Sequence, residues 1–129
     1  MRAWAEINLD AIVHNYKEIR RITNPNAKIM AIIKADGYGH GFKKIAEVLS
    51  ENGIDAFGVA TTDEALQIRK AGFTLPVLIL GIIPDDELNT VIENEISISV
   101  TNLMLAKKIS SAASKLHKNA RIHIKLDTG

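Results

Sequence analysis

The chain has 129 residues, no cysteine and a formal net charge of +1, with 47% hydrophobic and 24% charged residues. This balance is typical of one soluble globular domain and argues against a disordered chain. The small charge favours neither nucleic acid nor an anionic membrane surface as a partner, and disulfides and thiolate metal sites are excluded. Residues 1–7 carry no signal-peptide pattern and no apolar run could cross a bilayer, so a cytoplasmic protein is expected.

The first half of the chain alternates between helical and strand-like spacing of apolar residues. Residues 9–19 have the helical spacing, and Asn8 is placed to cap that helix. Residues 29–33 read IMAII without polar alternation, which predicts a strand that is buried on both faces. Residues 42–49 form a second helical stripe, and the Asn-Gly pair at 52–53 should end it.

The second half repeats this alternation. Residues 61–64 have the spacing of a capping box, which should open a helix that ends at Gly72. Pro84 should lead into a further helix, and Thr101 is placed to cap a long one. Strands are expected at residues 56–60, 77–80, 96–100 and 121–126.

Five strands separated by helices predict an α/β fold with a parallel sheet and right-handed crossovers. Two architectures fit: a doubly wound open sheet, or the N-terminal portion, about five βα units, of a (β/α)8 TIM-type barrel. The sequence stops at residues 127–129, directly after a strand and without a covering helix. A bare parallel edge strand is unusual and invites aggregation, so we favour part of a barrel.

Both architectures gather functional residues at the carboxyl ends of the strands, where residues 34–41 read KADGYGHG. Lys34 follows five apolar residues, and partial desolvation there would favour an amine that can attack a carbonyl group. The glycines at positions 37, 39 and 41 permit a tight turn close to a ligand. On spacing alone, the commoner alternative is a lysine that extends to solvent beside an ordinary glycine-rich turn.

Residues 31–41 resemble the pyridoxal-phosphate (PLP) attachment signature of alanine racemases, which is lysine, alanine, Asp or Asn, a small residue and then Tyr-Gly-His-Gly. Residues 3–11, 58–65 and 123–129 are also similar to segments of this family, so the resemblance covers essentially the whole chain. It implies a fold-type III PLP enzyme in which residues 1–129 are part of the N-terminal PLP-binding barrel domain. The rest of the barrel and a C-terminal β domain would lie outside these residues.

The resemblance also implies a function: racemisation of L- and D-alanine, which supplies D-alanine for the peptidoglycan of the bacterial cell wall. Lys34 would hold PLP as a Schiff base and exchange the α-proton on the D-alanine side, and Tyr38 would contact the cofactor phosphate. Lys125 matches a lysine that is often carbamylated in the family, with a surface-reaching strand lysine as the alternative. The full-length enzyme would be a homodimer, and residues 1–129 alone would be inactive because the opposing tyrosine base belongs to the C-terminal domain.

Three alternatives stay open. The substrate could be serine or another amino acid, because most substrate-pocket residues of the family lie downstream. The protein could also be a non-catalytic PLP-binding barrel, although such relatives lack the Tyr-Gly-His-Gly run. The third alternative is a self-sufficient five-stranded binding module without a cofactor. His40 and Gly41 should shape the turn after Lys34 and begin the next helix. No metal site is expected, because metal-ligand spacing is absent from the other three histidines, His14, His117 and His123.

Overall fold

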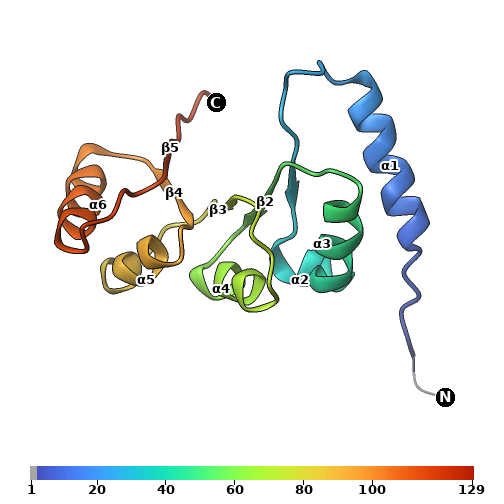
Figure 1. Cartoon of the computed structure of the whole chain (residues 1–129), viewed down its shortest axis with the longest axis horizontal. Coiled ribbons are helices and arrows are strands. Elements are labelled where there is room, and N and C mark those ends of the chain that lie inside the picture. The colour runs from blue at the N-terminus through green and yellow to red at the C-terminus, as the bar shows by residue number, and fades with distance from the viewer. Residues whose placement is uncertain (1–2) are drawn as a thin grey trace.

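A five-stranded parallel sheet forms the centre of the computed structural model, which describes residues 3–129 (Figure 1). The strands follow one another in the sheet in the same order as in the sequence, and each pairs in parallel with its neighbours. The five parallel strands predicted from the sequence are thereby confirmed. Residues 1 and 2 lie outside the described residues. They belong to the segment 1–7, in which the sequence shows no signal-peptide pattern. The strands are β1 (Met30–Ile32), β2 (Ala56–Val59), β3 (Val77–Ile79), β4 (Ser97–Val100) and β5 (Ile122–Ile124).

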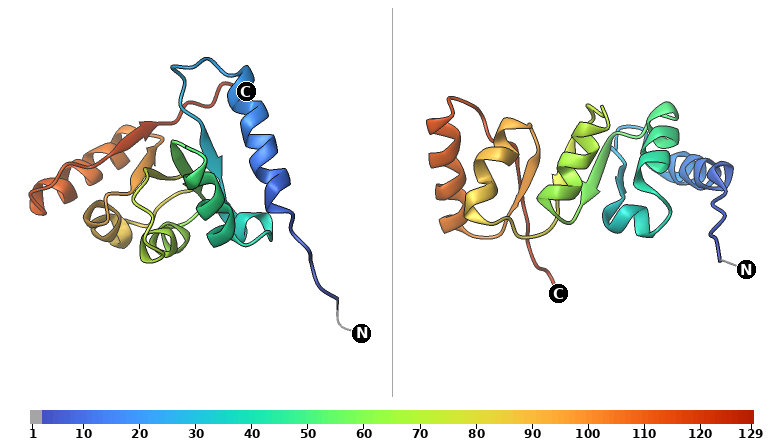
Figure 2. Two further views of the ribbon diagram at one scale, coloured as in Figure 1. Left: turned by 45° about the vertical axis from the view of Figure 1, so that its right-hand side comes forward. Right: turned by 90° about the horizontal axis from the view of Figure 1, so that it is seen from below.

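The helices follow one another along one side of the curved row of strands, from α1 at one end to α6 at the other (Figures 1 and 2). A doubly wound sheet would reverse its strand order and carry helices on both faces, whereas a barrel wall does neither. The sequential order therefore selects the barrel. Within residues 3–129, no helix is long and apolar enough to cross a membrane. The helical elements are α1 (Leu9–Ile22), α2 (Lys34–Tyr38), α3 (Phe42–Glu51), α4 (Thr62–Lys70), η1 (Asp85–Glu87), α5 (Leu88–Glu93) and α6 (Leu103–Lys115).

Two of the three predicted caps at helix N-termini, Asn8, residues 61–64 and Thr101, are confirmed. Asn8 accepts a hydrogen bond from the Ala11 amide at 3.0 Å, and residues 61–64 form the capping box of α4. The prediction that Thr101 caps α6 is wrong. The cap is Asn102, whose side chain accepts from the Leu105 amide at 2.8 Å, because the helix begins one residue later than the pattern suggested.

The hydrophobic core lies between the sheet and the helices. Phe57, Val77 and Ile79 are completely buried on the helix-facing side of β2 and β3. The prediction that the first strand is buried on both faces is wrong, because Ile32 is 38% exposed although Ile33 is only 3% exposed. β1 is an edge strand, and the sheet face that carries Ile32 is not covered by helices. The last strand is likewise an edge, and it covers Ile122–Ile124, a shorter span than the predicted residues 121–126.

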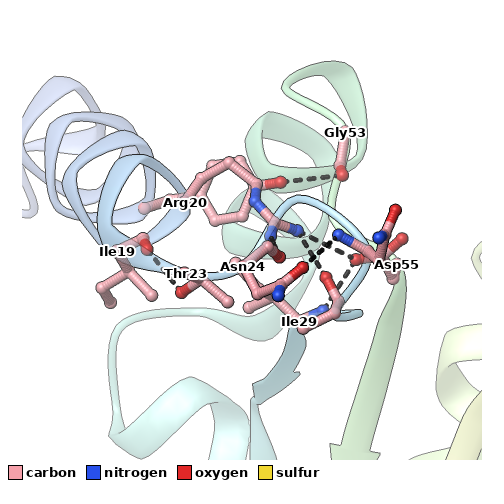
Figure 3. Close-up of polar contacts among 10 residues, drawn as sticks. Ile19, Arg20, Thr23, Asn24, Ile29, Gly53 and Asp55 are labelled. Atoms are coloured by element: carbon pink, nitrogen blue, oxygen red, sulfur yellow. Dashed lines mark hydrogen bonds and ion pairs between the residues drawn. The ribbon is translucent and has the colours of Figure 1, made fainter.

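The amino end of the sheet is fastened by polar contacts between α1 and the loops that lead into β1 and β2 (Figure 3). The Tyr16 hydroxyl donates to the Gly53 carbonyl at 2.8 Å, and the Arg20 guanidinium donates to two loop carbonyls. Asp55 lies 3.9 Å from Arg20 and also accepts from the Ile29 amide at 2.7 Å. These contacts fix the edge strand β1 at the end opposite Lys34, which is the end that serves stability in a barrel.

Candidate active site

Lys34 stands at the carboxyl end of β1, two residues after the last residue of the strand. The pairing between β1 and β2 ends just before Lys34, where the Ile33 amide donates to the Gly58 carbonyl at 2.9 Å. The lysine side chain is partly exposed, and its Nζ atom lies 5.9 Å from the centre of the Tyr38 ring. Among residues 3–129, no carboxylate forms an ion pair with this amine. The amine is therefore held at the rim of the sheet and free to meet a ligand.

The segment after Lys34 is a left-handed turn. Four consecutive residues of α2, from Ala35 to Tyr38, have φ values between 49° and 62°. A left-handed conformation costs an L-residue about 1–2 kcal/mol, and such strain persists only where surrounding contacts enforce it. The tight glycine-containing turn that was predicted is confirmed, but its handedness was not foreseen. Local strain directly beside a rim lysine is typical of a functional site.

Hydrogen bonds within the segment hold this turn. The Gly37 amide donates to the Ile33 carbonyl at 2.9 Å, and Asp36 accepts from the Phe42 amide at 2.8 Å, at the start of α3. Nδ1 of His40 lies 2.9 Å from the Gly37 carbonyl, which can only accept, so this nitrogen carries the proton. His40 thus shapes the turn, as the sequence suggested.

Replacing Gly37 by alanine should destabilise the fold by about 1–3 kcal/mol. Gly37 has a φ of +62°, and an added Cβ would lie 2.9 Å from Ile45 Cδ1 and 3.4 Å from the Phe42 Cα. Gly39→Ala is the matched control, because Gly39 also has a positive φ but an added Cβ would meet nothing within 4 Å. Urea unfolding of both variants measures the difference. Equal losses of unfolding free energy in the two variants would show that the packing around Gly37 does not contribute to stability.

One side chain from a neighbouring element reaches the turn. Oε1 of Glu64 accepts from the Ala35 amide at 2.7 Å, and Oε2 accepts from the amides of Ala60 at 2.7 Å and Thr61 at 3.3 Å. The sequence indicated Glu64 only as the partner of Thr61 in the capping box. Its contact with Ala35 joins residues 29 positions apart, and local spacing carries no signal for such a contact.

The structure brings Lys34 and Tyr38 together but leaves Lys125 apart from them. Lys125 follows β5, the opposite edge strand from β1, and its exposed amine lies 3.4 Å from the Leu80 carbonyl. Because all the strands are parallel, Lys34 and Lys125 stand at the same rim of the sheet. In residues 3–129, no three His, Cys, Asp or Glu side chains come together as a metal-binding group.

Comparison with known sequences gives matches along nearly the whole chain. Residues 7–129 match the family described as alanine racemase, N-terminal domain. An alanine racemase of Methanococcus maripaludis is 48% identical over 126 residues, which are 98% of this chain and 34% of that protein. Alanine racemase 1 of Caldanaerobacter subterraneus is 44% identical over 124 residues, which are 96% of this chain and 32% of that protein. The chain therefore spans about a third of the length of these relatives.

Solved structures agree with the sequence matches. The alanine racemase of Clostridium difficile 630 superposes with a TM-score of 0.95 at 40% identity, covering 100% of this chain and 34% of that one. A histidine racemase from Leuconostoc mesenteroides superposes with a TM-score of 0.86 at 28% identity, over 94% of this chain and 32% of that one. The five-stranded sheet is thus the N-terminal part of the alanine racemase barrel domain, and the chain belongs to the alanine racemase family.

Proposed function

We propose that this chain is part of a PLP-dependent alanine racemase and that Lys34 is the residue that holds the cofactor. The observation that carries the proposal is a lysine amine at the strand-end rim, without an ion pair among residues 3–129, followed by a strained turn. The high identity to named alanine racemases supports the same reaction.

The residues at this rim fit PLP. A primary amine that is not engaged in an ion pair can bond to the aldehyde carbon of the cofactor, with loss of water. When bound, PLP supplies an electron sink for negative charge at the substrate α-carbon. In this proposal, Nζ of Lys34 takes and returns the α-proton on the D-alanine side. The Tyr38 side chain is 59% exposed beside Lys34, so its hydroxyl would be available to donate to the cofactor phosphate.

We assign Lys125 a role in support of this site. Its exposed amine stands at the same rim, where its nitrogen can bond to the carbon of CO₂ with loss of a proton. The product, a carbamate, carries a negative charge with which it would orient an arginine elsewhere in the polypeptide. A ¹³C NMR signal of a carbamate in the intact protein kept in ¹³C-bicarbonate, lost in Lys125→Ala, is the expected result. Absence of this signal from the wild-type protein would contradict the assignment.

The complete enzyme would extend beyond these residues, because the chain spans about a third of its relatives. We propose that residues 1–129 form the N-terminal part, about five βα units, of the barrel domain, and that a longer polypeptide supplies the remaining barrel and a C-terminal β domain. We further propose a cytoplasmic homodimer that provides D-alanine for peptidoglycan. The opposing base would come from the second domain, so residues 1–129 alone would not racemise alanine.

A racemase with another substrate is the second candidate, favoured by the structural similarity to a histidine racemase. The test is to incubate the complete PLP-loaded protein with L-alanine, L-serine and L-histidine and to separate the enantiomers by chiral chromatography. We expect the highest kcat/KM for alanine. Faster turnover of serine or histidine would contradict alanine specificity. PLP binding without racemisation of any amino acid would instead support a non-catalytic PLP-binding protein.

A further inference from the structure

The Glu64 carboxylate joins the carboxyl ends of β1 and β2. One oxygen accepts from the amide of Ala35, the residue directly after Lys34, and the other from the amides of Ala60 and Thr61. A capping box requires only the bond between this side chain and the backbone of the N-cap residue Thr61. The 2.7 Å bond to Ala35 is therefore not explained by the capping of α4.

The left-handed turn forms few other hydrogen bonds with the rest of the described chain. Among residues 3–129, the bond from Ala35 to Glu64 is the one hydrogen bond that links residues 34–40 to a residue outside the segment 33–42. A cavity of about 200 Å³, lined in part by Asp36, Phe42 and Glu64, lies between the turn and α4. The turn packs against α3 at Gly37, but packing does not fill the space between the turn and α4. On that side its position depends on the hydrogen bond to Glu64.

From these contacts we propose that Glu64 is a positioning residue for Lys34. Glu64 holds the peptide plane between Lys34 and Ala35, and this plane sets the direction in which the Lys34 side chain leaves the backbone. Glu64 acts through the Ala35 amide, because it forms no ion pair with the Lys34 amine in the described part of the chain. This inference rests on the proposed role of Lys34 as the cofactor lysine.

The test is Glu64→Gln in the complete PLP-loaded protein. Glutamine has almost the same shape but only one accepting oxygen, so it cannot serve Ala35 and the end of β2 together. We expect kcat for alanine to fall about 10- to 100-fold because the lysine is misplaced, with KM nearly unchanged. We also expect faster amide hydrogen exchange in residues 34–41, which reports the turn independently of activity.

Asn102→Ala is the matched control. Asn102 caps α6 by accepting from the Leu105 amide, also after a strand of the sheet, but it does not contact the turn. Loss of this cap should lower Tm by about 2–8 °C and leave kcat and the exchange of residues 34–41 unchanged. Glu64→Asp is a second test variant, which keeps the negative charge at the start of α4 but is one methylene too short to span both ends.

The outcomes separate this inference from the proposed function. Wild-type kcat and wild-type hydrogen exchange in Glu64→Gln and Glu64→Asp would overturn the positioning role. An equal fall in kcat in Asn102→Ala would also overturn it, because the effect would then come from reduced stability in general. If the wild-type protein itself neither binds PLP at Lys34 nor racemises alanine, the proposed function fails. Hydrogen exchange in the Glu64 variants would still decide whether this carboxylate holds the turn.

Discussion

Lys34→Ala is expected to lower the racemisation of alanine by the complete protein by about 10⁴-fold or more. The change removes both the amine that would hold PLP and the group that would move the α-proton, and general acid–base catalysis alone contributes about 10²–10⁴-fold. The fold should be nearly unaffected, because the side chain is partly exposed and forms no ion pair within residues 3–129. Steady-state kinetics and thermal unfolding measure the two effects separately.

Lys43→Ala is the control for this prediction. Lys43 is an exposed lysine on α3, close in sequence to the turn and without an ion pair in the described residues. It should retain wild-type kcat, which shows that loss of a nearby positive charge does not cause the defect. A Lys34→Ala protein that racemised alanine at more than about a hundredth of the wild-type rate would show that another residue is the base.

Arg69→Met is expected to have the largest effect on stability, about 2–4 kcal/mol. The guanidinium donates to four carbonyls, those of Phe73 and Leu75 at 3.0 and 2.8 Å and those of Asn94 and Glu95 at 3.1 and 3.2 Å. Burial lowers the pKa of Arg69 from its ordinary value, but the four acceptors compensate for lost hydration. Methionine keeps the apolar stem and leaves these carbonyls without their donor.

Two further variants identify the cause of this loss. Arg69→Lys should recover only part of the stability, because a single ammonium group cannot reach four separated carbonyls. Arg21→Met is the control, since the pair that Arg21 forms with Glu18 is exposed and should contribute less than about 0.5 kcal/mol. Urea unfolding of the three variants measures the differences. A loss in Arg69→Met as small as that in Arg21→Met would show that the four bonds do not stabilise the fold.

Lys34 and Arg69 lie at opposite ends of the strands, so substitutions at the two positions should affect activity and stability separately. Arg69 joins the end of α4 to the loops that enter β3 and β4, at the amino end of the strands, whereas Lys34 stands at their carboxyl end. In barrels of this kind the carboxyl end carries the active site and the amino end serves stability. Arg69→Met should therefore retain kcat at a temperature where it is folded, while Lys34→Ala should retain its Tm.

The sequence predicted the order and type of the elements because both depend on local patterns. Apolar spacing located the five strands, and short polar signals located the caps at Asn8 and residues 61–64. The assignment failed at Thr101, where two adjacent residues are both good caps and the backbone favours Asn102. It also failed for the burial of β1, because the residues of a strand do not reveal whether it lies at the edge of a sheet.

The sequence could predict which residues belong to the candidate site, but not how they are arranged. Lys34 and Tyr38 were recognised from a continuous motif, but the left-handed conformation of Ala35 has no counterpart in the intrinsic preference of alanine, and a run of four left-handed residues is not a local preference of any sequence. The contact of Glu64 with Ala35 and the bonds of Arg69 to Asn94 and Glu95 join residues 25 or more positions apart. Such contacts depend on how the elements pack, and for this reason only the structure shows how the turn is held.

The most direct test of the cofactor assignment is reduction of the complete PLP-loaded protein with borohydride, followed by peptide mapping. Borohydride converts the bond between PLP and its lysine into a stable label, so the position of the label identifies the residue. We predict the label on Lys34, and its absence from the Lys34→Ala protein. A label on another lysine, or none on the wild-type protein, would contradict the assignment of Lys34 as the cofactor-binding residue.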